Sequence, residues 1–223
     1  MTPMPTLPSA TPNVSAAMRL AASAILVVLS GCALLGGRPK EPVTVYAPDP
    51  RVQTDPSWPT VPWQLSMTTP SASRMDDGLR ITVRPTPNEV QAYKGASWAK
   101  RPSEMLEDAV LRALEDSGKI SAVARQGSGI SSDYKLVLDI RRFESDYAGQ
   151  AAPAATIEVN AKLLHGQDPQ VVLSHTFLQT QPAASAAVAD VVAAFERALT
   201  DVSGDIGGWV LTEGDRHERG AHR

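Results

Sequence analysis

Three segments in the second half of the chain alternate between apolar and polar residues, and this constrains the fold more than any other feature of the sequence. They lie at residues 134–141, 157–163 and 171–180. A period of two is typical of a strand with one buried and one exposed face. Small residues at 148–155 and a turn at 165–169 separate the segments. The pattern therefore predicts three antiparallel strands joined as a meander.

The first half of the chain contains a weaker strand pattern. Leu79, Ile81 and Val83 alternate with polar residues, which predicts another half-buried strand. Residues 63–67 are expected to be its partner, and residues 70–78 are expected to form the loop between them. A strand pair in this region would extend the sheet formed by the meander.

Two helices are predicted, one on each side of the meander. The first begins at Pro102 and ends before Gly118, since proline fits the first helical turn and glycine favours the C-terminal cap. The second begins near Ser185, and its apolar residues are spaced four, three, four, three and four apart: Val188, Val192, Phe195, Leu199, Val202 and Ile206. A core-facing helix is favoured over a short coiled coil, and the following Gly204, Gly207 and Gly208 weaken its far end. The fold class expected is α+β, a mostly antiparallel sheet with both amphipathic helices packed on one face.

Composition and motifs argue against catalysis. The net charge is −3 and aromatic residues make up 5% of the chain, so no nucleic-acid partner is expected. A phosphate-binding loop, a nucleophile elbow and a zinc-protease motif are all missing from the sequence. Asp76 and Asp77 are interpreted as a solvated turn, and the four histidines are too scattered to surround one substrate atom. We expect no enzyme activity, cofactor or metal site.

The N-terminal region contains the one cysteine of the chain. The apolar residues 20–29 follow Arg19 and end in Leu29-Ser30-Gly31-Cys32. This run is too short to cross a bilayer, and its end resembles the bacterial lipobox, in which a signal peptidase cleaves before a lipidated cysteine. The alternatives are a secreted protein with a chance cysteine and a buried apolar helix. Ala33, in place of the aspartate that often retains lipoproteins at the inner membrane, predicts the periplasmic face of the outer membrane.

These observations divide the chain into four parts. Residues 1–31 are predicted to be a lipoprotein signal peptide, and residues 32–62, rich in proline, an extended tether with a short strand at 43–46. The α+β domain is expected at residues 63–211, followed by a polar, frayed tail at 212–223.

The aromatic residues Tyr93 and Trp98 flank the entrance to the first helix. Tyrosine and tryptophan are scarce in this chain, and two interpretations of this pair are open. Both residues could close the core between sheet and helix, or one or both could form an exposed anchor for a partner protein. They are the candidate partner-binding residues.

Several of these residues together resemble the ABC-type transport auxiliary lipoprotein family, which includes PqiC/YmbA-like lipoproteins. The resemblance runs from Trp63 to Val210 and rests on residues 79–83, Tyr93-x-x-x-x-Trp98, Pro102, Met105-Leu106, residues 111–118 and Val123. It implies a non-catalytic accessory role in lipid transport across the periplasm. The partners implied are a mammalian-cell-entry (MCE) domain protein and inner-membrane transporter components, and a homo-oligomer is also compatible. The alternatives are a stand-alone periplasmic lipid-binding lipoprotein and an outer-membrane assembly factor.

Overall fold

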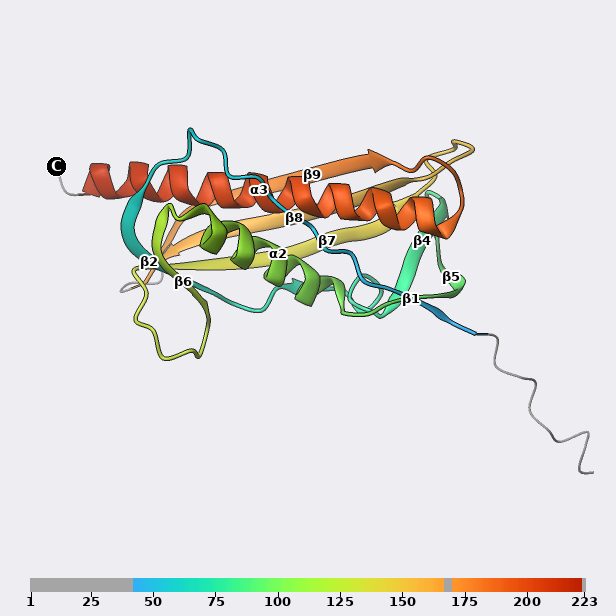
Figure 1. Cartoon of the computed structure of the whole chain (residues 1–223), viewed down its shortest axis with the longest axis horizontal. Helices are drawn as coiled ribbons and strands as arrows, with labels where there is room; N and C mark the ends of the chain where they lie inside the picture. Colours follow the sequence, from blue (N-terminus) through green and yellow to red (C-terminus); the bar gives the residue numbers. More distant parts are fainter. Residues whose placement is uncertain (1–41, 167–169, 222–223) are drawn as a thin grey trace, which may run out of the picture. The chain divides into compact units, whose positions relative to one another are not determined.

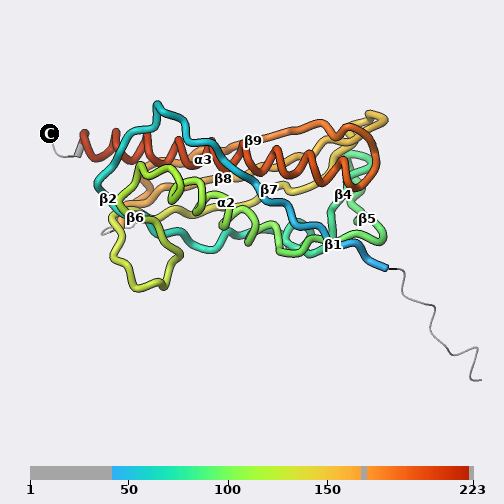
Figure 2. Tube along the Cα trace, viewed as in Figure 1, coloured from blue at the N-terminus to red at the C-terminus, as the bar shows by residue number. Residues whose placement is uncertain are grey.

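Strand β7 is the longest strand of the domain, and both of its edges are occupied (Figures 1 and 2). The computed structural model describes residues 42–166 and 170–221. The elements of this part are β1 (Thr44–Tyr46), β2 (Val61–Met67), β3 (Ser71–Ala72), β4 (Arg80–Thr86), β5 (Glu89–Trp98), α2 (Pro102–Ser117), β6 (Ile120–Arg125), β7 (Tyr134–Asp146), β8 (Ala154–His165), β9 (Val171–Pro182) and α3 (Val188–Ala221). The strands form one mixed sheet, and both helices contribute to the same core, so the expected α+β class is confirmed.

One edge of β7 carries the predicted meander. β7 pairs antiparallel with β8 from Tyr134 to Asp146, and β8 pairs antiparallel with β9. Alternation along β7 and β8 directs their apolar side chains toward α3. On this face Leu136, Leu138, Ile157 and Val159 are fully buried. The meander is confirmed.

The other edge of β7 shows an arrangement that alternation did not predict. β2, β3 and β4 follow one another along this edge, each parallel to β7. The expected pairing of residues 63–67 with the strand at 79–83 is therefore wrong. β2 lies between β6 and β7, and β4 lies between β5 and β7, because the chain continues in one direction along β7 rather than turning back. The sheet is consequently parallel on one side of β7 and antiparallel on the other.

Helix α2 begins and ends where its sequence predicted. Pro102 occupies the first turn, and Gly118 ends the helix with a left-handed φ of 61°. The backbone amide of Ser103 donates a hydrogen bond to the carboxylate of Asp77 over 2.9 Å, and the amide of Arg101 donates one to Glu104 over 3.1 Å. Two of the amides at the start of the helix thus have side-chain acceptors, as helix termini require.

Residues 47–60 do not behave as the free tether that their prolines suggested. Pro50 is buried, Trp58 packs against the core, and Arg112 of α2 donates a hydrogen bond to Asp49 over 2.6 Å. We call residues 47–60 the strap. It is shown in blue crossing the helices in Figure 1. The domain therefore begins at β1, and the expected boundary at residue 62 is corrected.

Helix α3 extends well beyond the glycines that were expected to weaken it, and residues 212–221 are helical rather than a frayed tail. The glycines provide space for tryptophans. A methyl group at Gly208 would lie 2.6 Å from Nε1 of Trp58, and one at Gly214 would lie 2.4 Å from Trp63. The space that glycine leaves is filled by an aromatic ring in both cases, and this packing offsets the poor helix propensity of glycine.

The last turns of α3 are also held by hydrogen bonds. The buried hydroxyl of Tyr134 lies 2.8 Å from Nδ1 of His217 and donates to the carboxylate of Glu218 over 2.8 Å. Burial and the adjacent Glu218 carboxylate raise the pKa of Tyr134, so this hydroxyl keeps its proton. The ring of Tyr134 packs edge-on against Trp63 at 4.9 Å between centroids. Tyr134 therefore links the start of β7 to the end of the chain.

We predict that Gly214→Ala destabilises the domain by about 1–3 kcal/mol, because the added methyl group overlaps the ring of Trp63, which is buried in the core. Gly220→Ala is the matched control. A methyl group at Gly220 meets nothing within 4 Å, so the better helix propensity of alanine should leave stability unchanged or raise it by up to about 1 kcal/mol. Urea unfolding measures both. Equal stability of the two variants would contradict the packing role of Gly214.

Candidate functional site

Cys32 lies outside the described residues, so its lipidation stays a prediction. Within the described chain, no helix has an apolar stretch long enough to cross a membrane. The structural evidence on the candidate site therefore concerns Tyr93 and Trp98, which both belong to β5, a strand that the sequence did not predict.

Trp98 is a core residue. Its side chain is 2% exposed and meets Phe195 of α3 edge-on at 5.2 Å and Phe143 of β7 at 6.1 Å. The rings of Phe143 and Phe195 stack at 5.0 Å. This three-ring cluster joins β5, β7 and α3. The interpretation of Trp98 as an exposed anchor is corrected, since a side chain in this position cannot contact a partner.

Tyr93 lies differently, at the margin of the core. It is half-buried, and its hydroxyl is hydrogen-bonded to the hydroxyl of Ser145 over 3.0 Å. Burial raises the pKa of Tyr93, so it is neutral at physiological pH. The residue as a whole remains partly accessible to solvent. Its role in partner binding stays a prediction.

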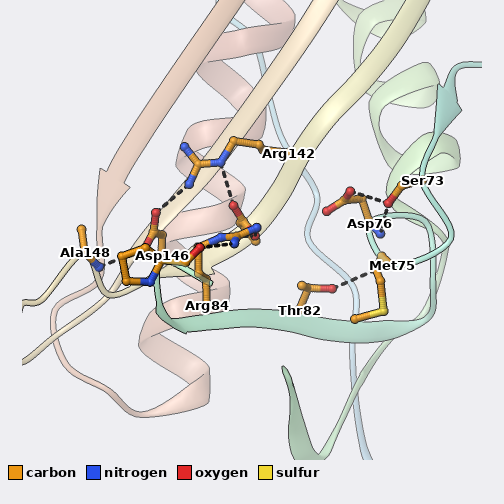
Figure 3. A network of polar contacts seen from close by, with 10 residues as sticks. Ser73, Met75, Asp76, Thr82, Arg84, Arg142, Asp146 and Ala148 are labelled. Carbon is orange, nitrogen blue, oxygen red and sulfur yellow. Dashed lines mark hydrogen bonds and ion pairs between the residues drawn. The ribbon is translucent and has the colours of Figure 1, made fainter. Parts of the chain in front are cut away.

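A network of charged residues surrounds the neighbouring end of β7 (Figure 3). Glu144 is 1% exposed and accepts hydrogen bonds from Arg84 of β4 over 3.0 Å and from Arg142 over 2.6 Å. Arg142 also donates to Asp146 over 2.6 Å. The hydrogen bond that Arg84 donates to Glu144 raises the pKa of Arg84 above its usual value. Two cations thus face two anions, and the charge within the network is balanced.

Because its charges are balanced, this network is suited to holding the structure together and not to binding an ion. A buried carboxylate costs free energy unless it is paired, and here both of its oxygens are paired. No charge in the network is left over for an ionic ligand. Arg84 also donates to the carbonyl of Pro87 over 2.9 Å, which connects the turn between β4 and β5 to β7. The network therefore positions the β4–β5 hairpin, and with it Tyr93.

The loop before β4 is fixed by local hydrogen bonds, also visible in Figure 3. The hydroxyl of Thr82 donates to the carbonyl of Met75 over 3.0 Å, and Ser73 donates to Asp76 over 2.6 Å. Asp76 therefore lies in a turn, as expected, whereas Asp77 accepts the hydrogen bond at the start of α2. In the described residues, no group of three or more histidine, cysteine or acidic side chains could hold a metal ion. The adjacent carboxylates serve local structure.

The fold is thus an α+β domain in which the charged groups around Glu144 and the carboxylate of Asp77 hold neighbouring segments in place. Comparison with known proteins gives the family. A family model described as ABC-type transport auxiliary lipoprotein component matches residues 44–207. The crystal structure of protein XCC0632 from Xanthomonas campestris is 56% identical, with a TM-score of 0.77, and the match covers 79% of this chain and 99% of that one. A second crystal structure, of an uncharacterized protein, is 15% identical with a TM-score of 0.59 over 75% and 97% of the two chains, which shows the shared fold alone. The search of curated proteins found no match.

The chain belongs to the family of ABC-type transport auxiliary lipoprotein components. The family match begins at Thr44, the first residue of β1, and so includes the strap. The resemblance noted from the sequence is confirmed.

We predict that Glu144→Gln lowers the free energy of unfolding by about 2–3 kcal/mol. Removing one partner of a buried ion pair typically costs about 3–5 kcal/mol, and the two arginines here are partly solvated, which reduces the effect. Glu213→Gln, which removes a surface ion pair with Arg216 on α3, is the control and should cost at most about 1 kcal/mol. Chemical denaturation distinguishes them. If both variants unfold alike, the network does not hold the hairpin.

Proposed function

We propose that this protein is a lipoprotein anchored through Cys32 to the periplasmic face of the outer membrane. It acts there as a non-catalytic accessory subunit of a lipid transport system. In this proposal residues 1–31 are removed as a signal peptide, and acyl chains on Cys32 hold the protein at the membrane. The observation that carries the proposal is the family match over residues 44–207. It is supported by a single cysteine placed directly after the apolar run and Ser30-Gly31.

The proposed partners are an MCE-domain protein and inner-membrane transporter components. Membership of an auxiliary transport family supports a role exercised through other proteins. The structure is consistent with this, because the charged network around Glu144 is internally balanced and serves to hold the β4–β5 hairpin in place. Tyr93, which belongs to that hairpin and is hydrogen-bonded to Ser145, is partly accessible and could offer an aromatic contact to a partner.

A stand-alone lipid-binding protein is the less favoured alternative, because the apolar side chains of the sheet and α3 are buried together in one core. Side chains from both sides of that core are fully buried: Ile157 and Val159 on β8, and Val202 and Ile206 on α3. One hollow of about 240 Å³ lies between the strap and α2, and another of about 550 Å³ lies between the strap and α3. The second has the size of a ligand pocket but is lined by charged residues such as Arg51, Asp201 and Asp205, which do not suit an acyl chain. Lipid carried inside this domain is therefore disfavoured. An outer-membrane assembly factor remains the other alternative, and an MCE gene beside this one would argue against it.

We expect Cys32→Ser to abolish incorporation of a clickable fatty acid and to leave the precursor uncleaved at this site. The hydroxyl of serine cannot replace the thiol as the acceptor of the diacylglycerol. In-gel fluorescence of the labelled protein, with Ser30→Ala as the control that keeps a small residue before the cysteine, measures the effect. Labelling that survives in Cys32→Ser would remove the proposed anchor.

We expect Tyr93→Ala to weaken co-purification with the MCE-domain partner. Aromatic anchors typically lose about 2 kcal/mol or more of binding on truncation, which is roughly a thirtyfold loss of affinity. Trp98→Ala should instead cost about 3–5 kcal/mol of stability, since it empties the three-ring cluster.

Leu178→Ala is the surface control for this test, since Leu178 is exposed on β9, away from the β4–β5 hairpin. Its binding should be unchanged. A folded Tyr93→Ala variant that binds as the control does would show that the docking surface lies elsewhere.

A further inference from the structure

Exposed apolar side chains gather at the corner of the sheet where the described chain begins. Val43 and Val45 lie at β1, Met75 and Leu79 in the loop before β4, and Val90 on β5, and their exposed fractions range from 36% to 61%. We call these five residues, together with Arg74 and Arg80, the corner patch. Contiguous exposed apolar surface on a monomer commonly marks a site of contact with a protein or a membrane.

Strand pairing places two parts of the patch on one face of the sheet. Val45 of β1 pairs with Ser97 of β5, and Ser97 pairs on its other side with Arg80 of β4. Adjacent strands are about 4.8 Å apart, so Val45 and Arg80 are separated by about 10 Å. Residues paired across strands share a face of the sheet, which places both side chains on the face opposite Trp98. Met75, Leu79, Arg80 and Val90 line one shallow hollow of about 360 Å³ on β4 and β5.

The charge of the patch is positive. Arg74 and Arg80 both line the hollow, and no acidic residue does. Within residues 42–166 and 170–221, neither arginine forms an ion pair with an acidic side chain. This differs from Arg84 and Arg142 nearby, which are both paired with Glu144. Apolar side chains next to unpaired arginines suit a surface that offers both acyl chains and phosphate groups.

The position of Cys32 in the sequence indicates which partner surface the corner patch contacts. Val43 belongs to the patch. The chain from Cys32 to Val43 can span at most about 40 Å when it is fully extended. An acyl anchor on Cys32 would thus keep this corner of the domain within about 40 Å of the membrane. We propose that the corner patch rests on the membrane, with its apolar side chains at the headgroup boundary and Arg74 and Arg80 bound to anionic phospholipid headgroups. This proposal rests on the proposed anchoring at Cys32 and adds an orientation to it.

The test measures membrane contact by the patch in a protein whose natural lipid anchor has been replaced. In Cys32→Ser the mature chain has no cysteine, so Leu79→Cys provides a unique position for an environment-sensitive fluorophore. A hexahistidine tag at residue 32 and a nickel-chelating lipid then hold the chain on vesicles of phosphatidylcholine and phosphatidylglycerol. Ile130→Cys is the matched control, because Ile130 is 47% exposed, close to the 48% of Leu79, but lies in the loop before β7 at the opposite end of the sheet (Figure 1).

The label at position 79 should be quenched by brominated lipid and protected from iodide in water, and the label at position 130 should show the reverse. Adding Arg74→Gln and Arg80→Gln should shift the contact equilibrium roughly thirtyfold toward solvent, since each basic residue near an anionic surface contributes about fivefold. Vesicles of phosphatidylcholine alone should have a similar effect. A label at position 79 that stays accessible to iodide on the tethered chain overturns the proposal, as does one insensitive to the arginine substitutions. Neither outcome bears on lipidation, which fatty-acid labelling tests by itself.

Discussion

The pairing of β7 on both edges is the constraint on which the rest of the structure depends. One edge holds β8 over the full length of β7, and the other holds β2, β3 and β4 in succession. Each of those short strands would be marginal alone, since isolated strands and hairpins bury too little surface. Against β7 they become one sheet, and α3 covers the apolar side that the sheet creates. The ion pairs of Glu144 and the ring of Phe143 secure its far end.

The sequence predicted what depends on neighbouring residues and missed what depends on distant ones. Alternation located β7, β8 and β9, and Pro102 and Gly118 marked the ends of α2. β5 was missed because its residues 89–95, beyond the stretch paired with β1, are mostly exposed on both faces, which weakens the period of two. The glycines of α3 predict a weak helix, since nothing near them in sequence reveals that Trp58 and Trp63 occupy the space they leave.

The same limit explains the candidate site. Tyr93 and Trp98 were identified together because both are rare aromatic residues, yet one is at the margin of the core and the other inside it. In a strand, a shift of one residue exchanges the two faces, and β5 is irregular at Gly95, where φ is 65°. Spacing alone could not assign either residue to a face. The apolar residues of the corner patch are scattered from Val43 to Val90, so only the pairing of strands brings them together.

The contact between the two ends of the domain also governs the order in which it can fold. Trp58 and Trp63, near its beginning, pack on Gly208 and Gly214, near the end of the chain, and β2 pairs with strands far downstream. Contacts of such long sequence separation make folding slow, because loop closure must come before they form. The strands that precede β7 can pair among themselves, β1 and β4 with β5 and β2 with β6, but Trp58 and Trp63 lack their packing surface until α3 has formed. The core of the domain is therefore completed only when its last helix, α3, has packed against the strap and β2.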